Sequence, residues 1–400
     1  MQGSKLTDEA ALAPLLRQAF RPLFLLGGLF SAGAMLLWGL ALAGWISLDP
    51  YRNVLFWHQH EMIFGFVAAI IVGFLLTAVQ NWAGTRATHG GELLVLVLVW
   101  LAGRGLMLFG AGLPPALVAA VDLAFLPLAA WYFGSIVLAA GNTRNLFFVP
   151  LLLLLMVCNG LMHTGAILNR FELVQYGSLN AIWLVTLVMA IVSGRVLPMF
   201  TANGTGTTKV EPLIWLDRAA LGCLWLIFAL HFLALTPRLP ATLLALLFAL
   251  AALLHLLRIL RLRFWITLRV PLLWSLHAAA LFIPFGLALF AARHAGLAVT
   301  QSTAVHALTA GAMGGMILSM MARVSLGHTG RPLQPHPLMT LAFALVISAA
   351  LLRLAAPSLL PGSLTAWYLL AIAAWVLAYL AYSVLYLPLL SRPRPDGRPG

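Results

Sequence analysis

The chain alternates long apolar runs with short polar turns along almost its whole length. A membrane-spanning helix needs about 20 mostly apolar residues, and these runs are continuous, unlike the alternating pattern of barrel strands. Because only helices satisfy their own backbone hydrogen bonds at this length, the pattern predicts an all-α integral membrane protein. We expect twelve transmembrane helices, at about 20–46, 54–80, 91–110, 114–140, 145–168, 174–200, 213–235, 239–260, 269–292, 300–323, 337–355 and 363–388.

Composition supports the class of integral membrane protein and indicates which partners to expect. Of 400 residues, 62% are hydrophobic and 8% are charged, whereas about a quarter of a soluble chain is charged. The 23 Lys and Arg exceed the 10 Asp and Glu, giving a formal charge of +13. A chain this apolar has no basic soluble face, so we expect a lipid bilayer and no nucleic acid as its surroundings.

The positions of the basic residues predict the orientation. If the N-terminus is cytoplasmic, most Lys and Arg fall on the cytoplasmic side, as the positive-inside rule requires. Both termini are therefore expected in the cytoplasm, with an N-terminal segment at 1–19 and a disordered Pro/Gly-rich tail at 389–400. The opposite side would hold only Arg52, Arg170, Arg238, Arg293 and Arg353.

Similar residues recur at a spacing that suggests internal repeats. Arg21, Arg144 and Arg269 each precede a predicted helix, 123 and 125 residues apart, and His60 and His306 lie 246 residues apart. Either three four-helix units follow one another, or the spacing is a coincidence among similar apolar helices. A twelve-helix body with threefold pseudo-repeats resembles the haem-copper oxidase architecture, by fold-level analogy only. The three units would span about 20–140, 144–263 and 269–388.

Histidines are the main candidates for chemistry inside the membrane. Titratable side chains in spanning helices are costly and mark functional sites by default. Neutral imidazole binds haem iron and copper, and it is cheaper to bury in hydrocarbon than a carboxylate. The alternative is that each histidine is a hydrogen-bonded packing residue. Five are expected in the outer third of the membrane and one deeper, namely His58, His60, His163, His231 and His306, with His277 as the deeper one.

Neighbouring polar residues could orient these rings. His58 and His60 are two positions apart and point to different sides of a helix, so they could serve two centres or share a frayed first turn. Asn159 stands four residues before His163 and could orient its ring. Glu61 could accept the free N–H of His60 or carry protons.

Arginines offer candidate anion sites. Arg104 and Asp122 are expected at similar depth on consecutive helices, where they could form a salt bridge, or Arg104 could face a haem propionate. Arg323, His328 and Arg331 lie at the cytoplasmic end of the tenth predicted helix. They could be ordinary positive-inside charges, an anion or propionate site, or a proton entrance.

Several segments carry a family resemblance, which covers about residues 20–388. The stretches FRPLFLL, WHQHEMIFGF, GFLLTAVQNWAGT, SGRVLPMFT and HALTAGAMGGMILSMMARVSLGHTGR resemble the NnrS family of bacterial integral membrane proteins. The resemblance implies a bacterial inner-membrane protein associated with haem, copper and the response to nitric oxide. The residues that match the family motifs are His58, His60, Glu61, His306 and His328.

Ligand roles follow from combining the resemblance with the predicted topology. We expect His58 or His60, together with His306, to bind haem b, and His163 and His277 to serve a second centre, which could be copper or a second haem. Glu61 and Tyr176 are the expected proton carriers.

Three functions are compatible with these residues. The first is reduction of nitric oxide to nitrous oxide, as in denitrification, with electrons from quinol or a donor protein. The second is a non-enzymatic, haem-based nitric oxide binder or sensor that protects against nitrosative stress. The third is a metal or anion transporter, which threefold repeats disfavour because most transporters have twofold repeats.

Overall fold

The computed structural model describes residues 12–359 and 361–398, so part of the predicted segment 1–19 and the last two residues of the tail lie outside it. Every regular element in the described residues is helical. Twelve helical segments there are long and apolar enough to cross a membrane, one for each predicted run. The prediction of an all-α, multi-pass membrane protein is therefore confirmed.

The chain forms two compact units, which are described separately. Unit 1 comprises Met1–Ala181, Met321–Leu333 and Tyr379–Gly400, and unit 2 comprises Ile182–Met320 and Gln334–Ala378. Helices α9 (Phe171–Thr205), α15 (Gly315–His328) and α17 (Leu364–Ser391) each contribute residues to both units.

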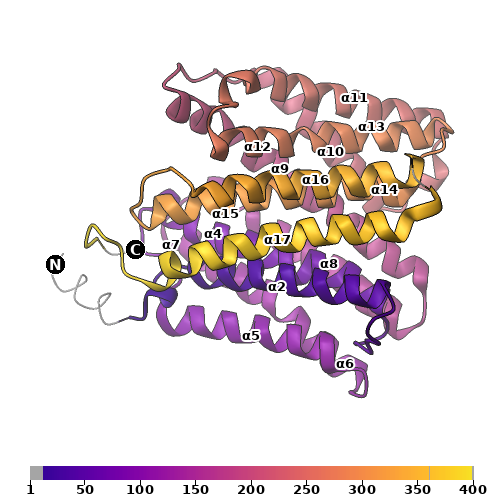
Figure 1. The fold of residues 1–400 in the computed structure, drawn as a ribbon, viewed down its shortest axis with the longest axis horizontal. Coiled ribbons are helices and arrows are strands. Elements are labelled where there is room, and N and C mark those ends of the chain that lie inside the picture. Colours follow the sequence, from indigo (N-terminus) through magenta and orange to yellow (C-terminus); the bar gives the residue numbers. More distant parts are fainter. Residues whose placement is uncertain (1–11, 360, 399–400) are drawn as a thin grey trace. The chain divides into compact units, whose positions relative to one another are not determined.

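The remaining helices of unit 1 run side by side along a common direction (Figure 1). Within this unit α2 packs on α4, α7 packs on α4 and α8, and α6 packs on α5 and α8. Their bounds are α2 (Phe20–Leu42), α3 (Val54–His60), η2 (Glu61–Val67), α4 (Ala68–Ala83), α5 (Gly90–Phe109), α6 (Pro115–Leu123), α7 (Phe125–Ala139) and α8 (Phe148–Ile167).

Unit 2 is centred on α13, which packs against α11, α14 and η6. Its helices are α10 (Ile214–Phe232), α11 (Ala241–Leu260), α12 (Pro271–Ala280), α13 (Phe282–His294), α14 (Gln301–His306), η6 (Ala307–Gly314) and α16 (Pro337–Leu359). Short 3₁₀ turns cap or connect helices in both units, at η1 (Pro14–Leu16), η3 (Thr143–Asn145), η4 (Thr236–Arg238), η5 (Phe264–Thr267) and η7 (Pro361–Ser363).

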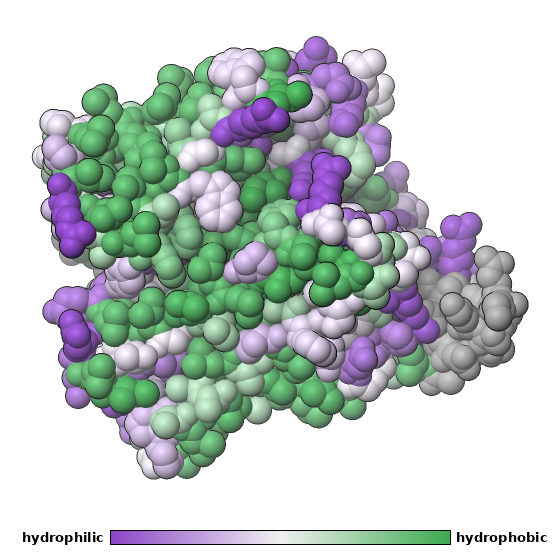
Figure 2. Space-filling view, turned by 180° about the vertical axis from the view of Figure 1, so that it is seen from behind, coloured by the Kyte–Doolittle hydropathy of each residue, from purple (hydrophilic) through white to green (hydrophobic). Residues whose placement is uncertain are grey.

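Helix α5 illustrates why these helices suit a bilayer. Its apolar side chains lie on both sides: Leu93 and Leu96 are buried, while Leu94, Leu98 and Leu101 are exposed. In water, exposure of the apolar outer face of such a helix would be unfavourable, whereas lipid tails are as apolar as that face and can cover it. The visible face in Figure 2 is mostly hydrophobic along the helices, and hydrophilic residues gather mainly near the helix ends.

Two helices widen into π-helical turns at matching places in the sequence. The turn η2 begins directly after His60, and η6 begins directly after His306. These are the histidines that lie 246 residues apart. Since π-turns are rare and frequently occur at functional sites, both positions are candidates for a functional role.

The C-terminal tail carries contacts where the sequence predicts disorder. Helix α17 continues to Ser391, three residues beyond Pro388. Arg21 then donates from Nη1 to the carbonyls of Leu390 and Arg392, at 2.8 and 2.9 Å. A Pro/Gly-rich composition does not reveal such contacts, because they depend on an arginine distant in sequence.

Candidate metal centre

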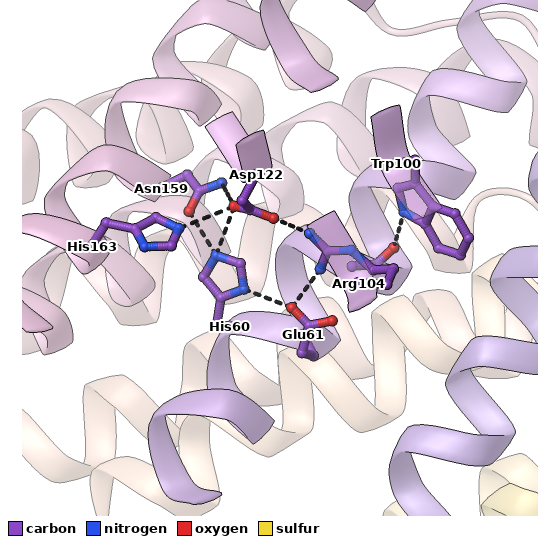
Figure 3. Close-up of polar contacts among 8 residues, drawn as sticks. His60, Glu61, Trp100, Arg104, Asp122, Asn159 and His163 are labelled. Atoms are coloured by element: carbon purple, nitrogen blue, oxygen red, sulfur yellow. Dashed lines mark hydrogen bonds and ion pairs between the residues drawn. The ribbon is translucent and has the colours of Figure 1, made fainter. Parts of the chain in front are cut away.

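Six polar side chains converge inside unit 1 and are all nearly or fully buried. They come from four separate stretches of helix, and Figure 3 shows them pointing toward one another. Two lie at the junction of α3 and η2, one on α5, one on α6 and two on α8: His60 and Glu61, Arg104, Asp122, and Asn159 with His163.

Arg104 links the two carboxylates of this cluster. Its Nη1 donates to Glu61 Oε1, and its Nη2 donates to Asp122 Oδ1. Of the two alternatives that the sequence leaves for Arg104, the structure shows the ion pair with Asp122, and it adds Glu61 as a second partner. The planar fork of a guanidinium allows this double pairing, which a lysine could not reproduce.

His60 contacts oxygen atoms through both ring nitrogens. Nδ1 donates to Glu61 Oε1 at 2.9 Å, as the sequence predicts, and Nε2 donates to Asn159 Oδ1 at 2.7 Å. Asp122 Oδ2 lies 3.2 Å from the same Nε2. With Glu61 and Asp122 ionised, all three oxygens are acceptors, and contacts at both ring nitrogens then require the imidazolium form of His60. Two cations, on His60 and Arg104, therefore balance the two carboxylates.

Asn159 and His163 both meet Asp122. Asn159 Nδ2 donates to Asp122 Oδ2 at 2.7 Å, and His163 Nε2 lies 3.1 Å from the same oxygen. We expected Asn159 to orient His163, but its amide oxygen contacts His60 instead. The two residues share one helix face and thus one carboxylate partner, as their spacing of four allows.

Three of these residues are arranged as metal ligands. One ligand atom from each of His60, Asp122 and His163 lies within 4.8 Å of the others, and all three residues are buried. Atoms bonded to one ion at about 2.0–2.2 Å lie roughly 3–3.5 Å apart. The 3.1 and 3.2 Å separations from Asp122 Oδ2 to the two Nε2 atoms match that spacing.

The π-turn and a glycine make room for this cluster. Consecutive residues of an α-helix point 100° apart, and the wider η2 turn lets His60 and Glu61 both reach the cluster. A Cβ on Gly65 would lie 2.7 Å from Arg104 Nη1 and 3.0 Å from Glu61 Oε2. The Gly65 carbonyl accepts from Trp100 Nε1 at 2.9 Å, which ties η2 to α5 (Figure 3).

Replacing Gly65 with Ala is therefore expected to destabilise the protein. The added methyl group must displace the guanidinium or the neighbouring ring of Phe30, and such overpacking costs about 1–3 kcal/mol. Gly105→Ala is the matched control on α5, because its Cβ meets nothing within 4 Å. That control should gain about 0.5–1 kcal/mol from helix propensity. Thermal unfolding in detergent measures both, and equal effects of the two substitutions would contradict the close approach at Gly65.

Tyr51 covers one side of the cluster and was missed from the sequence. It lies between α2 and α3, is 2% exposed, and its ring centroid lies 5.6 Å from that of His163. Its buried hydroxyl makes no close hydrogen bond among the described residues, and the neighbouring charge is the Arg52 guanidinium, 5.5 Å from the Tyr51 ring centroid. Burial raises the pKa of the Tyr51 phenol above its ordinary value of 10.0. No sequence motif marks Tyr51, since it stands in a connection and not in a spanning helix.

We expect Tyr51→Phe to leave the protein equally stable or to stabilise it by about 1 kcal/mol, because it removes an unsatisfied buried hydroxyl. The pKa of Tyr51 is higher in the folded protein than its unfolded value of about 10, so the contribution of the neutral phenol to the free energy of unfolding is complete below pH 10. That contribution is lost as the pH rises through the folded pKa. Unfolding measured from pH 8 to 11 should show this loss in the wild type and a smaller one in the variant.

Two other predicted residues of unit 1 lie elsewhere. His58 stacks on Trp38, with ring centroids 4.4 Å apart and an interplanar angle of 13°. It thus points to a different side of the helix from His60, as its spacing predicts. Tyr176 is half-buried on α9, and its backbone carbonyl accepts from Asn180 Nδ2 at 2.9 Å.

His277 and His306 belong to unit 2. His277 is 1% exposed, its Nε2 contacts Thr201 Oγ1 at 2.9 Å, and its Nδ1 has no partner among the described residues. His306 is half-buried and donates from Nδ1 to the Ser302 carbonyl at 2.7 Å. Their roles as cofactor ligands stay predictions.

The three residues predicted near the end of the tenth helix belong to unit 1. Arg323 is 7% exposed. The His328 ring packs on Phe20, with centroids 5.6 Å apart, and its carbonyl accepts from Arg394. Arg331 Nη1 donates to the Thr329 carbonyl at 3.3 Å.

A model of a known protein family matches almost the whole chain. The family is described as "NnrS protein", and the match covers residues 14–394. It includes every residue of the buried cluster. No curated protein of similar sequence was found.

Proposed function

The chain belongs to the NnrS family, and on that basis we propose that it is a membrane metalloprotein of the nitric oxide response. The observation that carries the proposal is the buried grouping of His60, Asp122 and His163 at ligand spacing. We propose that these three residues bind a single transition-metal ion, which would take the place of the proton on His60 Nε2.

The donor set indicates which metals suit the site. Two imidazoles and one carboxylate are typical ligands of non-haem iron, and imidazole also suits copper. Either metal, if held by these three residues, would supply a centre that can bind nitric oxide. A small uncharged ligand of this kind can reach a site enclosed by apolar helices, whereas a charged substrate would have to be desolvated.

Haem does not fit the cluster as it is packed. His60 is fully buried, and both of its ring nitrogens contact protein oxygens. Its ring also lies between those of Phe56 and Phe64, with centroid distances of 5.6 and 5.1 Å. A planar macrocycle would have to displace these side chains, so we propose a single ion here and derive no step through haem.

The other members of the cluster would hold and tune the ligands. Glu61 accepts from His60 Nδ1, an outer hydrogen bond that fixes the ring for binding through Nε2. Arg104 compensates the negative charge of both carboxylates through its two ion pairs. Asp122 uses Oδ1 for Arg104 and directs Oδ2 toward both imidazoles, so one carboxylate can serve two roles.

Reduction of nitric oxide to nitrous oxide is the finer proposal. It consumes two electrons and two protons for each pair of nitric oxide molecules and also releases water. Electrons would come from quinol or a donor protein. The Tyr51 hydroxyl, buried beside His163 without a hydrogen-bond partner among the described residues, is a proton donor within the site.

We also propose the bacterial inner membrane as the location, with both termini in the cytoplasm. The support is the gathering of Lys and Arg on one side of the predicted spans. The twelve candidate spans require a lipid bilayer in any case.

Metal analysis and nitric oxide titration of the detergent-purified chain test the proposal. We expect one iron or copper per chain and a change in its electron paramagnetic resonance or optical spectrum when nitric oxide is added without oxygen. Nitrous oxide formed with a chemical electron donor would support reduction, and spectral binding without it would favour a binder or sensor. A protein without iron or copper, and without a response to nitric oxide, would overturn the metal centre.

A further inference from the structure

A pocket with a mostly apolar lining and a few charged side chains lies within unit 2, near the ends of α9 and α11 and the start of α10. Its cavity volume is about 50 Å³, within a wider recess of about 580 Å³ that includes open solvent. Buried apolar side chains, among them Leu197, Leu216 and Ile283, form its inner wall. Neither the family nor the proposed metal centre accounts for this pocket.

Two arginines supply the positive charge of the pocket: Arg258 on α11 and Arg261, the residue directly after that helix. Arg258 donates from Nε to Asp217 Oδ1 at 2.7 Å, and its Nη1 lies 3.4 Å from His255 Nδ1. Its Nη2 makes no hydrogen bond to the described residues. Arg261 donates to the Glu211 carbonyl at 3.1 Å. Both guanidinium groups line the pocket and retain N–H donors for an anion such as phosphate.

Three oxygen acceptors line the same pocket. Asp217 is half-exposed and carries one carboxylate, while the exposed Glu211 carboxylate makes no hydrogen bond or ion pair with the described residues. The third comes from Gly194, a lining residue with a backbone carbonyl oxygen. In a regular helix it would accept from the N–H of residue 198, but that residue is Pro198, which has none.

Exposed aromatic residues place the pocket at the depth of lipid headgroups. Trp215, next to the lining residue Leu216, is 62% exposed, and Trp265, four residues after Arg261, is 54% exposed. Tryptophan gathers at the membrane–water interface, where its ring is apolar and its N–H is hydrated. Exposed apolar residues such as Ile214 and Leu257 continue from this level along α10 and α11, where acyl chains would lie.

We propose that this pocket binds the headgroup of a zwitterionic phospholipid with a primary ammonium, that is, a phosphoethanolamine headgroup. Its phosphate meets Arg258 and Arg261. Its ammonium has three N–H donors, which match the acceptors of Asp217, Glu211 and Gly194. The equal numbers of cations and carboxylates favour this zwitterion over an anionic headgroup, and the separate acceptors favour a primary ammonium over a quaternary one, which cannot donate.

Native mass spectrometry of the full chain from nanodiscs tests the proposal. The nanodiscs contain equal amounts of phosphatidylethanolamine, phosphatidylglycerol and phosphatidylcholine with the same acyl chains. We expect the wild type to retain phosphatidylethanolamine over phosphatidylcholine by about tenfold, the size of one charge-assisted hydrogen bond. Glu211→Gln and Asp217→Asn should reduce that preference, and Arg258→Gln should weaken retention of all three lipids.

Arg218→Gln is the matched control, since Arg218 is exposed, adjoins Asp217 and does not line the pocket. It should change nothing. Soluble phosphoethanolamine added at millimolar concentration should not displace the lipid, because the acyl chains contribute to binding; displacement would identify a headgroup-sized soluble ligand instead and overturn the lipid assignment. Equal retention of the three lipids, preference for phosphatidylglycerol, or displacement by a quinone analogue would also overturn it. Glu211→Gln keeps the test decisive if Arg258→Gln does not fold, because Glu211 lies on the exposed connection before α10.

Discussion

Replacing Arg104 with Leu is expected to lower the free energy of unfolding by about 3–5 kcal/mol, the cost of removing one partner from a buried ion pair. In the metal-free protein, the substitution leaves Glu61 and Asp122 buried with only His60 to balance them. Both carboxylates are at most 1% exposed, so water cannot replace the lost guanidinium. Thermal and denaturant unfolding in detergent, compared with the wild type, measure the loss.

A second substitution should recover much of this stability. In Arg104→Leu/Glu61→Gln, one carboxylate and the His60 imidazolium remain, so the buried charges balance again. Arg104→Lys keeps the charge but loses the fork that reaches both carboxylates, and should fall between the wild type and Arg104→Leu. If Arg104→Leu were as stable as the wild type, or if Glu61→Gln lowered its stability further, the charge balance described for the cluster would be wrong.

Hydropathy predicts every span of this fold, because the bilayer imposes a length and a composition that can be counted along the chain. Helix ends are less predictable. The sixth span was expected at 174–200, whereas α9 extends over Phe171–Thr205, since hydrogen bonding carries a helix into polar residues that hydropathy excludes. Hydropathy does not predict the π-turns either, because a π-turn changes the hydrogen bonding of a helix and not its apolar composition. Apart from Glu61 and Thr309, the residues of η2 and η6 are apolar or glycine, as in much of the neighbouring helices.

The candidate site could be predicted in part. His60, His163, Glu61 and Arg104 were selected because ionisable groups inside apolar helices need a reason to be there. The sequence could not predict that His60 lies beside His163, since 103 residues separate them and hydropathy does not indicate which helices contact each other. Asp122 was expected only as a partner of Arg104, and its second oxygen, which faces both imidazoles, is a matter of side-chain orientation.

Loss of the metal is the expected result of replacing His163 with Ala. Removing even an outer partner of a metal ligand costs about 10–100-fold in affinity, so removing one of three ligands should cost more than about a hundredfold. His163→Gln keeps a side-chain amide that can donate to Asp122 and should preserve folding while still losing the metal. Metal content per chain and the spectral response to nitric oxide should fall together in both variants.

His231→Ala is the control for this experiment, because His231 is a half-buried membrane histidine of unit 2 that contacts the Ile227 carbonyl through Nδ1 at 2.9 Å. It should keep its metal. If His163→Ala and His163→Gln retained a full complement of iron or copper, the ion would be held elsewhere. If His231→Ala lost the metal as well, the loss would reflect general damage to the protein and the assignment to His163 would fail. Only the combination of two depleted variants and one loaded control places the ion at His60, Asp122 and His163.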